Sequence, residues 1–459
     1  MPQTQGMRWM RRSVRRSANL VAPGRWKPRL VFWTAALAIG VLSVGFARAA
    51  DAAHLWFERL TTGPGLGPYL PLALTPLGFL ACAALATRYF PGSEGSGIPQ
   101  AIAARHLRKT AERGWYLSLR LAAGKVVLTV VGLACGASIG REGPTVQLGA
   151  SIMLQAARVG GMAHARGLIL AGSAAGIAAA FNAPLAGIVF AIEEMGRGYQ
   201  ARTNGLVLSA VIIAGLSSLA LVGSYTYFGV TDEVARLSTD LPLIGVCGVG
   251  GGALGAVFSS AVLWLTRRIR RWRAARPRST PYLVAGVAGL VVAVLGIAAG
   301  GATFGTGYGE ARGALEGDAL PLHFFALKLA ATLASTVSGI PGGLFAPSLA
   351  VGAGIGSTIG VVLGANIGLA ALLGMAGYFA GVVQAPMTAF IILLEMTGNQ
   401  TNVIALMTTA MLGYGTARIL SPEPLYHALS RLVLADAIRR SREIERAAAA
   451  SQSSEKPSG

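Results

Sequence analysis

Long apolar stretches recur along the chain and predict helices that cross a membrane. Each is close to the twenty or so residues that a helix needs to span the hydrocarbon core of a bilayer. The stretches are 31–50, 69–90, 115–139, 204–223, 241–265, 281–300, 322–338 and 402–420. The pattern predicts an all-α, polytopic membrane protein. A signal peptide is the alternative for the first stretch, but its basic leader is too long for one, so we expect an uncleaved span.

Shorter apolar pieces, broken by Gly and Pro, lie between the long stretches. They cover 96–107, 144–157, 167–192, 347–364, 368–380 and 383–396. Non-helical backbone at membrane depth is stable only where it is buried in protein or lines a cavity. We therefore expect the interrupted segments to form the interior of the protein and to carry its function.

The chain also repeats itself. The segment Ala183–Glu193 matches Ala385–Glu395 at an offset of 202, and Pro144–Gly149 matches Pro347–Gly352 at an offset of 203. Both matches fall on interrupted segments. Paired broken segments in two halves of a chain indicate a transport site between the halves. The matches alone leave open whether the halves are parallel or inverted.

Composition and charge agree with a membrane protein. Charged residues make up 13% of the chain, about half the share in an ordinary soluble domain. Much of the net charge of +20 comes from two clusters, 1–30 and 266–278, which hold no acid and lie beside apolar stretches. The positive-inside rule places both clusters in the cytoplasm. The charge therefore indicates topology, and we expect no nucleic-acid partner.

The sequence offers no pattern for a cofactor, a metal site or an enzyme. Its three Cys and five His are far apart and form no metal-ligand spacing. No phosphate-binding loop with GKS or GKT is present, and we see no nucleophile–base pair for a membrane-embedded enzyme. We expect ion gradients to drive any transport, without a nucleotide.

Four segments marked by Gly and Pro carry the candidate chemistry. They are Gly95–Pro99, Gly140–Pro144, Ala180–Pro184 and Gly342–Pro347. Pro fits the first turn of a helix and a preceding Gly lets the backbone turn, so each segment predicts a helix N-terminus inside the membrane. The free N–H groups and the dipole there favour an anion. The alternative for any one segment is that Gly and Pro only allow close helix packing.

These segments, in this order, resemble the motifs of the CLC chloride channel and transporter family, and most of all its prokaryotic chloride/proton antiporters. The resemblance covers residues 31–436. It implies two inverted repeats, about 69–225 and 242–436, built of many short, tilted and re-entrant helices. It also implies a homodimer with one anion pathway per subunit.

The resemblance and the charge pattern together give an expected placement in the cell. Residues 1–30 form a basic cytoplasmic N-terminal tail, and 437–459 form a short cytoplasmic C-terminal tail without a regulatory domain. The protein is then a multi-pass protein of the cell inner membrane, in contact with lipid, with both termini in the cytoplasm.

Residue by residue, the resemblance implies an anion path. Ser96 resembles the inner anion-coordinating Ser, and the backbone amides of Leu344 and Phe345 resemble the donors of the central site. Tyr426 resembles the phenol that closes the inner side. The family usually has Ile where this chain has Leu344, which matters little because the backbone N–H binds. Lys125 resembles a lysine near the pathway that tunes its electrostatics.

Two carboxylates are the candidate proton carriers, since acids within membrane segments are functional candidates by default. Glu142, beside the charge of Arg141, resembles the gating and external proton glutamate. It would occupy an anion site when ionised and swing away when protonated. Glu194 resembles the internal proton glutamate of the antiporters, where the channels generally lack an acid. For Glu193 and Glu194 the alternative is a solvated helix end, and Glu395 forms a repeat pair with Glu193.

The function that we expect is secondary active transport of chloride across the membrane in exchange for protons. Its alternative is a passive, voltage- or pH-gated chloride channel. The acid at Glu194 weighs against the channel. Ser96 further predicts a preference for chloride over nitrate, because relatives that prefer nitrate carry Pro at this position.

Overall fold

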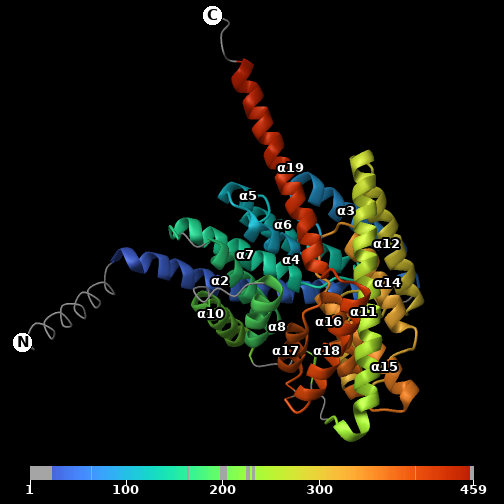
Figure 1. Cartoon of the computed structure of the whole chain (residues 1–459). Coiled ribbons are helices and arrows are strands. Elements are labelled where there is room, and N and C mark those ends of the chain that lie inside the picture. The colour runs from blue at the N-terminus through green and yellow to red at the C-terminus, as the bar shows by residue number, and fades with distance from the viewer. Residues whose placement is uncertain are drawn as a thin grey trace, which may run out of the picture.

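The computed structural model describes residues 23–63, 65–162, 165–196, 204–223, 228–229, 233–398 and 400–454, and over these residues the chain is a bundle of helices (Figure 1). Two isolated bridges between extended segments are its strand-like contacts. Most of the predicted tail 1–30 lies outside the described residues. The predicted tail 437–459 begins inside a helix that continues to Ser454.

The helices follow one another with short connections. In chain order they are α2 (Pro23–Thr61), η1 (Gly67–Tyr69), α3 (Pro71–Tyr89), α4 (Ile98–His106), α5 (Thr110–Gly114), α6 (Leu119–Ala134), α7 (Glu142–Val159), α8 (Ala165–Phe181), α9 (Pro184–Phe190), the π-helix η2 (Ala191–Met195), α10 (Asn204–Val222), α11 (Leu237–Ala275), α12 (Thr280–Ala298), α13 (Tyr308–Leu315), α14 (Phe324–Val337), α15 (Phe345–Leu363), α16 (Ile367–Val383), α17 (Pro386–Thr397), α18 (Val403–Leu420) and α19 (Leu425–Ser454).

Eight helices of the described part are long and apolar enough to cross a membrane. Seven of them coincide with predicted stretches. The predicted span 322–338 is wrong in length, because α14 has 14 residues. The eighth is α15, a continuous 19-residue helix where the sequence predicted an interrupted piece.

Glycines in α15 do not break the helix, because they serve its contact with α16. A Cβ on Gly356 would collide with the carbonyl oxygen of Ala370, and a Cβ on Gly352 would lie 2.6 Å from Cα of Met375. The two backbones therefore touch, as small residues allow in membrane helix pairs. The same reason explains the buried contact between Gly149 of α7 and Gly172 of α8.

The repeat found in the sequence extends through the helix order. Helices α7, α8 and α9 begin at 142, 165 and 184, and α15, α16 and α17 begin at 345, 367 and 386. Asn182 and Gln384 are the non-glycine residues with positive φ in the described part, at 53° and 57°. Both stand two residues before a Pro that starts a helix, so the two halves share an uncommon turn.

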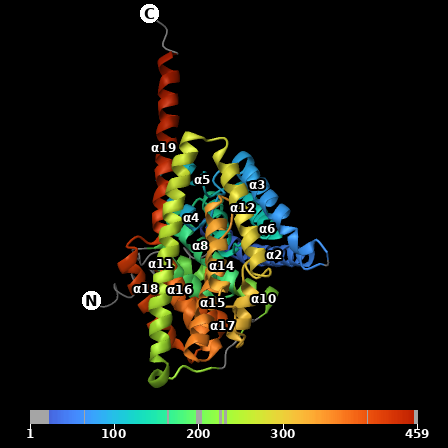
Figure 2. The same cartoon turned by 90° about the vertical axis from the view of Figure 1, so that its right-hand side faces the viewer.

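The Arg-rich cluster 266–278 lies at one end of the molecule. Helix α19 rises from the body at the same end as the turn between α11 and α12 (Figures 1 and 2). This turn belongs to the Arg-rich cluster 266–278, and Arg270 pairs with Asp436 of α19 at 2.6 Å. We call this end the α19 end. Residues 51–59, which follow the predicted span 31–50, lie inside α2, so this helix is longer than the apolar stretch.

Candidate functional site

Three extended segments meet in the molecule, each just before a helix N-terminus. The Gly95 N–H donates to the Ile340 carbonyl at 3.2 Å, and the Gly95 carbonyl accepts from Gly342 at 3.3 Å. Gly140 and Gly343 exchange two backbone hydrogen bonds of 2.7 Å. These contacts hold the starts of α4, α7 and α15 together, so the positive ends of three helix dipoles converge. We call this place the junction.

Glu142 lies at the junction as the first residue of α7, with its side chain fully buried. A Cβ on Gly140 would collide with Oε2 of Glu142 and lie 3.2 Å from Cδ of Pro347. The carboxylate therefore fills the space next to the first turn of α15. Neither oxygen makes a hydrogen bond of ordinary geometry with a described residue. The structure thus places a buried carboxylate beside a helix N-terminus, where the helix dipole favours negative charge.

The hydroxyls of Ser96 and Tyr426 lie together on the α19 side of the junction. Tyr426 is fully buried and Ser96 is nearly so. The two side chains interact, but neither hydroxyl has a well-formed hydrogen bond to a described residue. Ser96 also touches the first turn of α7, because a Cβ on Gly143 would collide with its Oγ. Two buried O–H donors are thus available to an anion.

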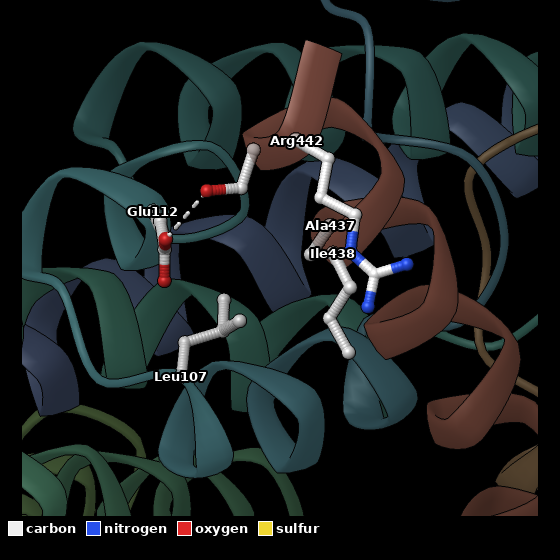
Figure 3. Close-up of a pocket in the computed structure, with 6 residues that line it drawn as sticks. Leu107, Glu112, Ala437, Ile438 and Arg442 are labelled. Carbon is white, nitrogen blue, oxygen red and sulfur yellow. Dashed lines mark hydrogen bonds between the residues drawn. The ribbon is translucent and has the colours of Figure 1, made fainter. Parts of the chain in front are cut away.

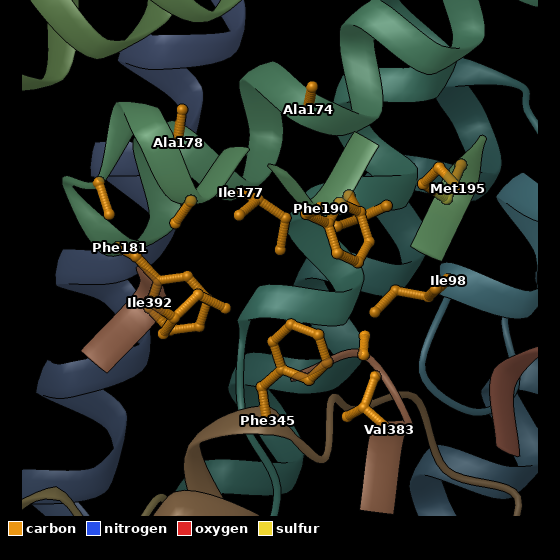
Figure 4. Packing of buried hydrophobic residues seen from close by; sticks show 14 of the residues in the cluster. Ile98, Ala174, Ile177, Ala178, Phe181, Phe190, Met195, Phe345, Val383 and Ile392 are labelled. Atoms are coloured by element: carbon orange, nitrogen blue, oxygen red, sulfur yellow. The ribbon is translucent and has the colours of Figure 1, made fainter. Parts of the chain in front are cut away.

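The backbone N–H groups of Leu344 and Phe345 open α15. Leu344 is the N-cap and Phe345 the first helical residue, so neither N–H has an acceptor within the helix. The Phe345 ring is held by neighbouring rings, two of which are labelled in Figure 4. Their centroid distances to Phe345 are 4.8 Å for Phe379, 5.8 Å for Tyr426, and 6.1 Å for both Phe181 and Phe190. These aromatic contacts hold the side chain of the first residue of α15 in the core.

Lys125 holds the loop that carries Ser96. It is fully buried, and its Nζ donates to the Gly95 carbonyl at 2.9 Å. Lys328, 203 residues further along, is buried in the same way and donates to the carbonyls of 303–305 at 2.9 to 3.3 Å. Each half therefore uses a buried ammonium to fix a loop before a short helix. The sequence analysis missed Lys328, although the repeat offset pointed to it.

Arg141 faces away from the junction, towards α2. Its Nη1 donates to the Ala47 carbonyl at 2.8 Å and to Oδ1 of Asp51 at 2.7 Å. Only 4% of Arg141 is exposed, whereas the Asp51 side chain is mostly exposed. The guanidinium anchors the start of α7 to α2, and its charge is one residue from Glu142.

Glu194 lies at the α19 end of the same interior. It belongs to the π-helix η2 and its side chain is 2% exposed. Nε2 of His427 lies 3.0 Å from the backbone carbonyl of Glu194 and 3.9 Å from its Oε1. Tyr426 is within electrostatic reach of both Glu194 and Glu142. The structure therefore buries Glu194, and the alternative of a solvated helix end does not apply to it.

Glu193 and Glu395 cap helices in opposite halves. The Glu193 carboxylate accepts from the N–H groups of Met387 and Thr388 at 3.1 and 2.6 Å, at the start of α17. The Glu395 carboxylate accepts from the N–H groups of Leu185 and Ala186 at 3.0 and 2.6 Å, at the start of α9. The predicted anion site at the N-terminus of α9 is therefore filled by Glu395.

A cavity of about 140 Å³ lies between α5 and α19 and shares no lining residue with the junction (Figure 3). It is lined by Leu107, Glu112, Ala437, Ile438, Ser441 and Arg442. Ser441 donates to Glu112 at 3.0 Å, and the Lys109 ammonium lowers the pKa of the Glu445 carboxyl. These contacts dock α19. No group of three His, Cys, Asp or Glu side chains placed to hold a metal is found in the described part of the chain.

Known transporters match this sequence. A family model described as voltage gated chloride channel matches residues 77–418. The H(+)/Cl(-) exchange transporter ClcA of Yersinia pestis bv. Antiqua (strain Angola) is 31% identical over 429 residues, which cover 86% of this chain and 85% of the relative.

Solved structures match the fold. A slow cyanobacterial Cl⁻/H⁺ antiporter has a TM-score of 0.78 at 24% identity, covering 89% of this chain and 98% of that one. A CLC-type fluoride/proton antiporter has a TM-score of 0.71 at 24% identity, covering 87% and 96%. The chain belongs to the voltage gated chloride channel family, the CLC family, and has its polytopic, all-α fold of two inverted repeats.

Proposed function

We propose that this chain is a secondary active transporter that exchanges chloride for protons across a membrane. The observation that carries the proposal is the buried carboxylate of Glu142, which starts α7 and lies next to the first turn of α15, whose N–H groups are expected to bind the anion. An ionised carboxylate and a chloride ion repel each other and compete for one place. Each protonation of Glu142 is thereby linked to the movement of chloride. The names of the curated relatives support the same pair of ions.

The anion path that we propose runs through the junction. Ser96 and Tyr426 offer hydroxyl donors on the α19 side, and Leu344 and Phe345 offer backbone donors in the centre. These are neutral groups, and the converging helix dipoles add partial positive charge. Such a site offsets the cost of burying an anion without a bound cation that would hold it permanently.

The proton path that we propose joins Glu142 to Glu194. Lys125 and Arg141 shape the potential around the path, Lys125 through the Ser96 loop and Arg141 through its charge beside Glu142. The burial of Glu194 favours exchange over the passive channel, because a channel has no use for a buried titratable group away from the anion path.

The placement in the cell is also a proposal. We infer a multi-pass protein of the inner membrane, with the α19 end and both termini in the cytoplasm. Apolar side chains at the starts of α9 and α17 are exposed, at 55% for Leu185 and 45% for Met387. Lipid or a second copy of the chain would cover them, and we propose a homodimer with one pathway per subunit.

Flux measurements in proteoliposomes test the proposal. The purified protein is reconstituted with a chloride gradient, and chloride release and internal pH are recorded together. Exchange predicts uphill proton movement driven by the chloride gradient, in fixed proportion to the chloride that moves. A chloride flux that leaves the internal pH unchanged would show a passive channel instead.

A further inference from the structure

His427 stands between the buried Glu194 and the aqueous α19 end. It follows Tyr426 at the start of α19, and its side chain is 15% exposed against 2% for Glu194. Its Nε2 is 3.0 Å from the Glu194 backbone carbonyl. The imidazole therefore lies beside Glu194 and is itself partly in contact with water.

The backbone explains why the two side chains meet. Residues 191–195 form a π-helix, whose wider turn displaces side chains from their α-helical positions and is frequent at functional sites. The contact with the Glu194 carbonyl keeps the imidazole beside this turn and places a proton on Nε2. Nε2 is then 3.9 Å from Oε1 of Glu194. A side-chain rotation that moves one of these atoms by about 1 Å brings them to hydrogen-bond distance.

We propose that His427 carries protons between water at the α19 end and Glu194, an inference that rests on the proposed exchange function. Imidazole takes a proton from water and becomes imidazolium. The imidazolium releases the Nε2 proton to Oε1 of Glu194, which leaves a neutral imidazole with its proton on Nδ1 and a neutral carboxylic acid. The reverse sequence returns the proton to water. Histidine suits this task because its ordinary pKa lies near neutrality.

A purely structural role is the competing explanation. In that case His427 only caps the carbonyl at the end of η2, and a side chain with one N–H donor would replace it. Glutamine offers such a donor but cannot accept and release a proton near neutral pH. The substitution His427→Gln therefore keeps the N–H donor that caps the carbonyl and removes the ability to carry a proton.

The experiment compares wild type, His427→Gln, His427→Ala and the control His106→Gln in proteoliposomes. His106 also contacts a backbone carbonyl, within its own helix α4: its Nδ1 lies 2.8 Å from the carbonyl oxygen of Ile102. Proton and chloride fluxes are recorded together. We expect His427→Gln to lower the proton flux about a hundredfold, the low end of what a positioned acid–base group contributes, while chloride continues to move, and His106→Gln to match wild type. Imidazole added on the α19 side should restore proton flux to His427→Ala.

The outcomes separate the two proposals. Full proton flux in His427→Gln, with a coupled wild type, would overturn the role of His427 and leave the exchange function standing. Low proton flux in His427→Ala that imidazole does not restore would also overturn it, in favour of a structural cap. A wild type that moves chloride without protons would remove the exchange function, and the role of His427 with it.

Discussion

Neutralising Glu142 should separate the two ion fluxes. Gln has the shape of the protonated side chain and cannot take up or release a proton, so the Glu142→Gln variant should move chloride and abolish proton transport. The carboxylate starts α7 and is fully buried, so bulk water cannot take over its proton transfer. The measurement is proton and chloride flux in proteoliposomes. Unchanged proton coupling would remove Glu142 from the proton path.

The Glu194→Gln variant should lose proton transport but keep chloride binding and chloride flux. Glu194 is buried at the α19 end, in η2, and the proposed backbone donors Leu344 and Phe345 belong to another helix. We therefore expect uncoupled chloride flux with little change in chloride binding, measured by calorimetry on the same preparation. A collapse of chloride binding would show that Glu194 supports the structure of the site instead of carrying protons.

Ser96 should set the preference between chloride and nitrate. Its hydroxyl is a buried donor without a well-formed acceptor in the described structure, and Pro would remove that donor while the backbone N–H groups of α15 remain. A hydrogen bond to a charged group contributes roughly 1.5–3 kcal/mol, which is about tenfold or more in affinity. We expect wild type to favour chloride and Ser96→Pro to shift proton-coupled exchange towards nitrate.

The comparison of nitrate-driven with chloride-driven proton pumping measures this preference. Ser96→Ala is the matched control, since it removes the hydroxyl without restricting the backbone. If the nitrate-to-chloride ratio is the same in all three proteins, Ser96 does not determine selectivity. A shift in Ser96→Pro alone would assign the effect to the loop backbone instead of the hydroxyl.

At the scale of helices, the crossed caps should stabilise the contact between the two halves. Glu395 binds two N–H groups at the start of α9, and a neutral amide loses the charge-assisted part of these bonds. Glu395→Gln should lower the free energy of unfolding by about 1.5 kcal/mol, measured as a fall in the thermal unfolding temperature in detergent. Glu423→Gln is the control, because its pairs with Arg267 and Arg431 are exposed. Equal stability of Glu395→Gln and wild type would contradict the cap.

Local sequence rules predicted the helix starts of the interior well. Pro restricts φ to helical values, and Gly allows the positive φ that Gly97 adopts before α4, so the starts of α4 and α9 follow from Gly97-Ile98-Pro99 and Pro184. The glycines of α15 were misread, because close contact with α16 and a break in the helix need the same residue type. The destination of Glu395 could not be predicted, since it depends on how the two halves dock.

At the site, too, the sequence predicted local turns but not contacts between distant residues. Motif order pointed to Ser96, Leu344 and Glu142 because each belongs to a local turn that the sequence specifies, although their functional roles stay predictions. The approach of His427 to Glu194 joins residues 233 positions apart and depends on the π-helix, for which the sequence carries no clear signal. Contacts of this kind are tertiary and need the fold.

For the whole molecule, the inverted repeat brings both halves of the site to one junction. Gly95 and Gly140 belong to the first half, and their backbone hydrogen-bond partners Ile340, Gly342 and Gly343 belong to the second. Neither half alone can build the junction, because each extended segment finds its hydrogen-bond partner in the other half. The site and the fold therefore form together, and we expect no functional isolated half.

The membrane orientation gives a last prediction. The α19 end carries the Arg-rich turn, and the positive-inside rule places it in the cytoplasm. Helix α12 leads away from this turn, and residues near 319 follow it after α13, so we expect them to face the outside. The native cysteines Cys82, Cys135 and Cys247 are buried. They should react little with a thiol reagent, so labelling reports on a cysteine introduced at the surface. Arg278 and Ala319 are both exposed and serve as the two test positions.

In intact cells, a membrane-impermeant maleimide should label Ala319→Cys and leave Arg278→Cys unlabelled, because only the first faces the outside. Both should react after the membrane is permeabilised, which controls for expression and for exposure of the thiol. The reverse pattern would invert the topology and place Glu142 and Glu194 on the opposite sides from those proposed. The direction of proton delivery through His427 would then also reverse, since it follows from which side of the membrane the α19 end faces.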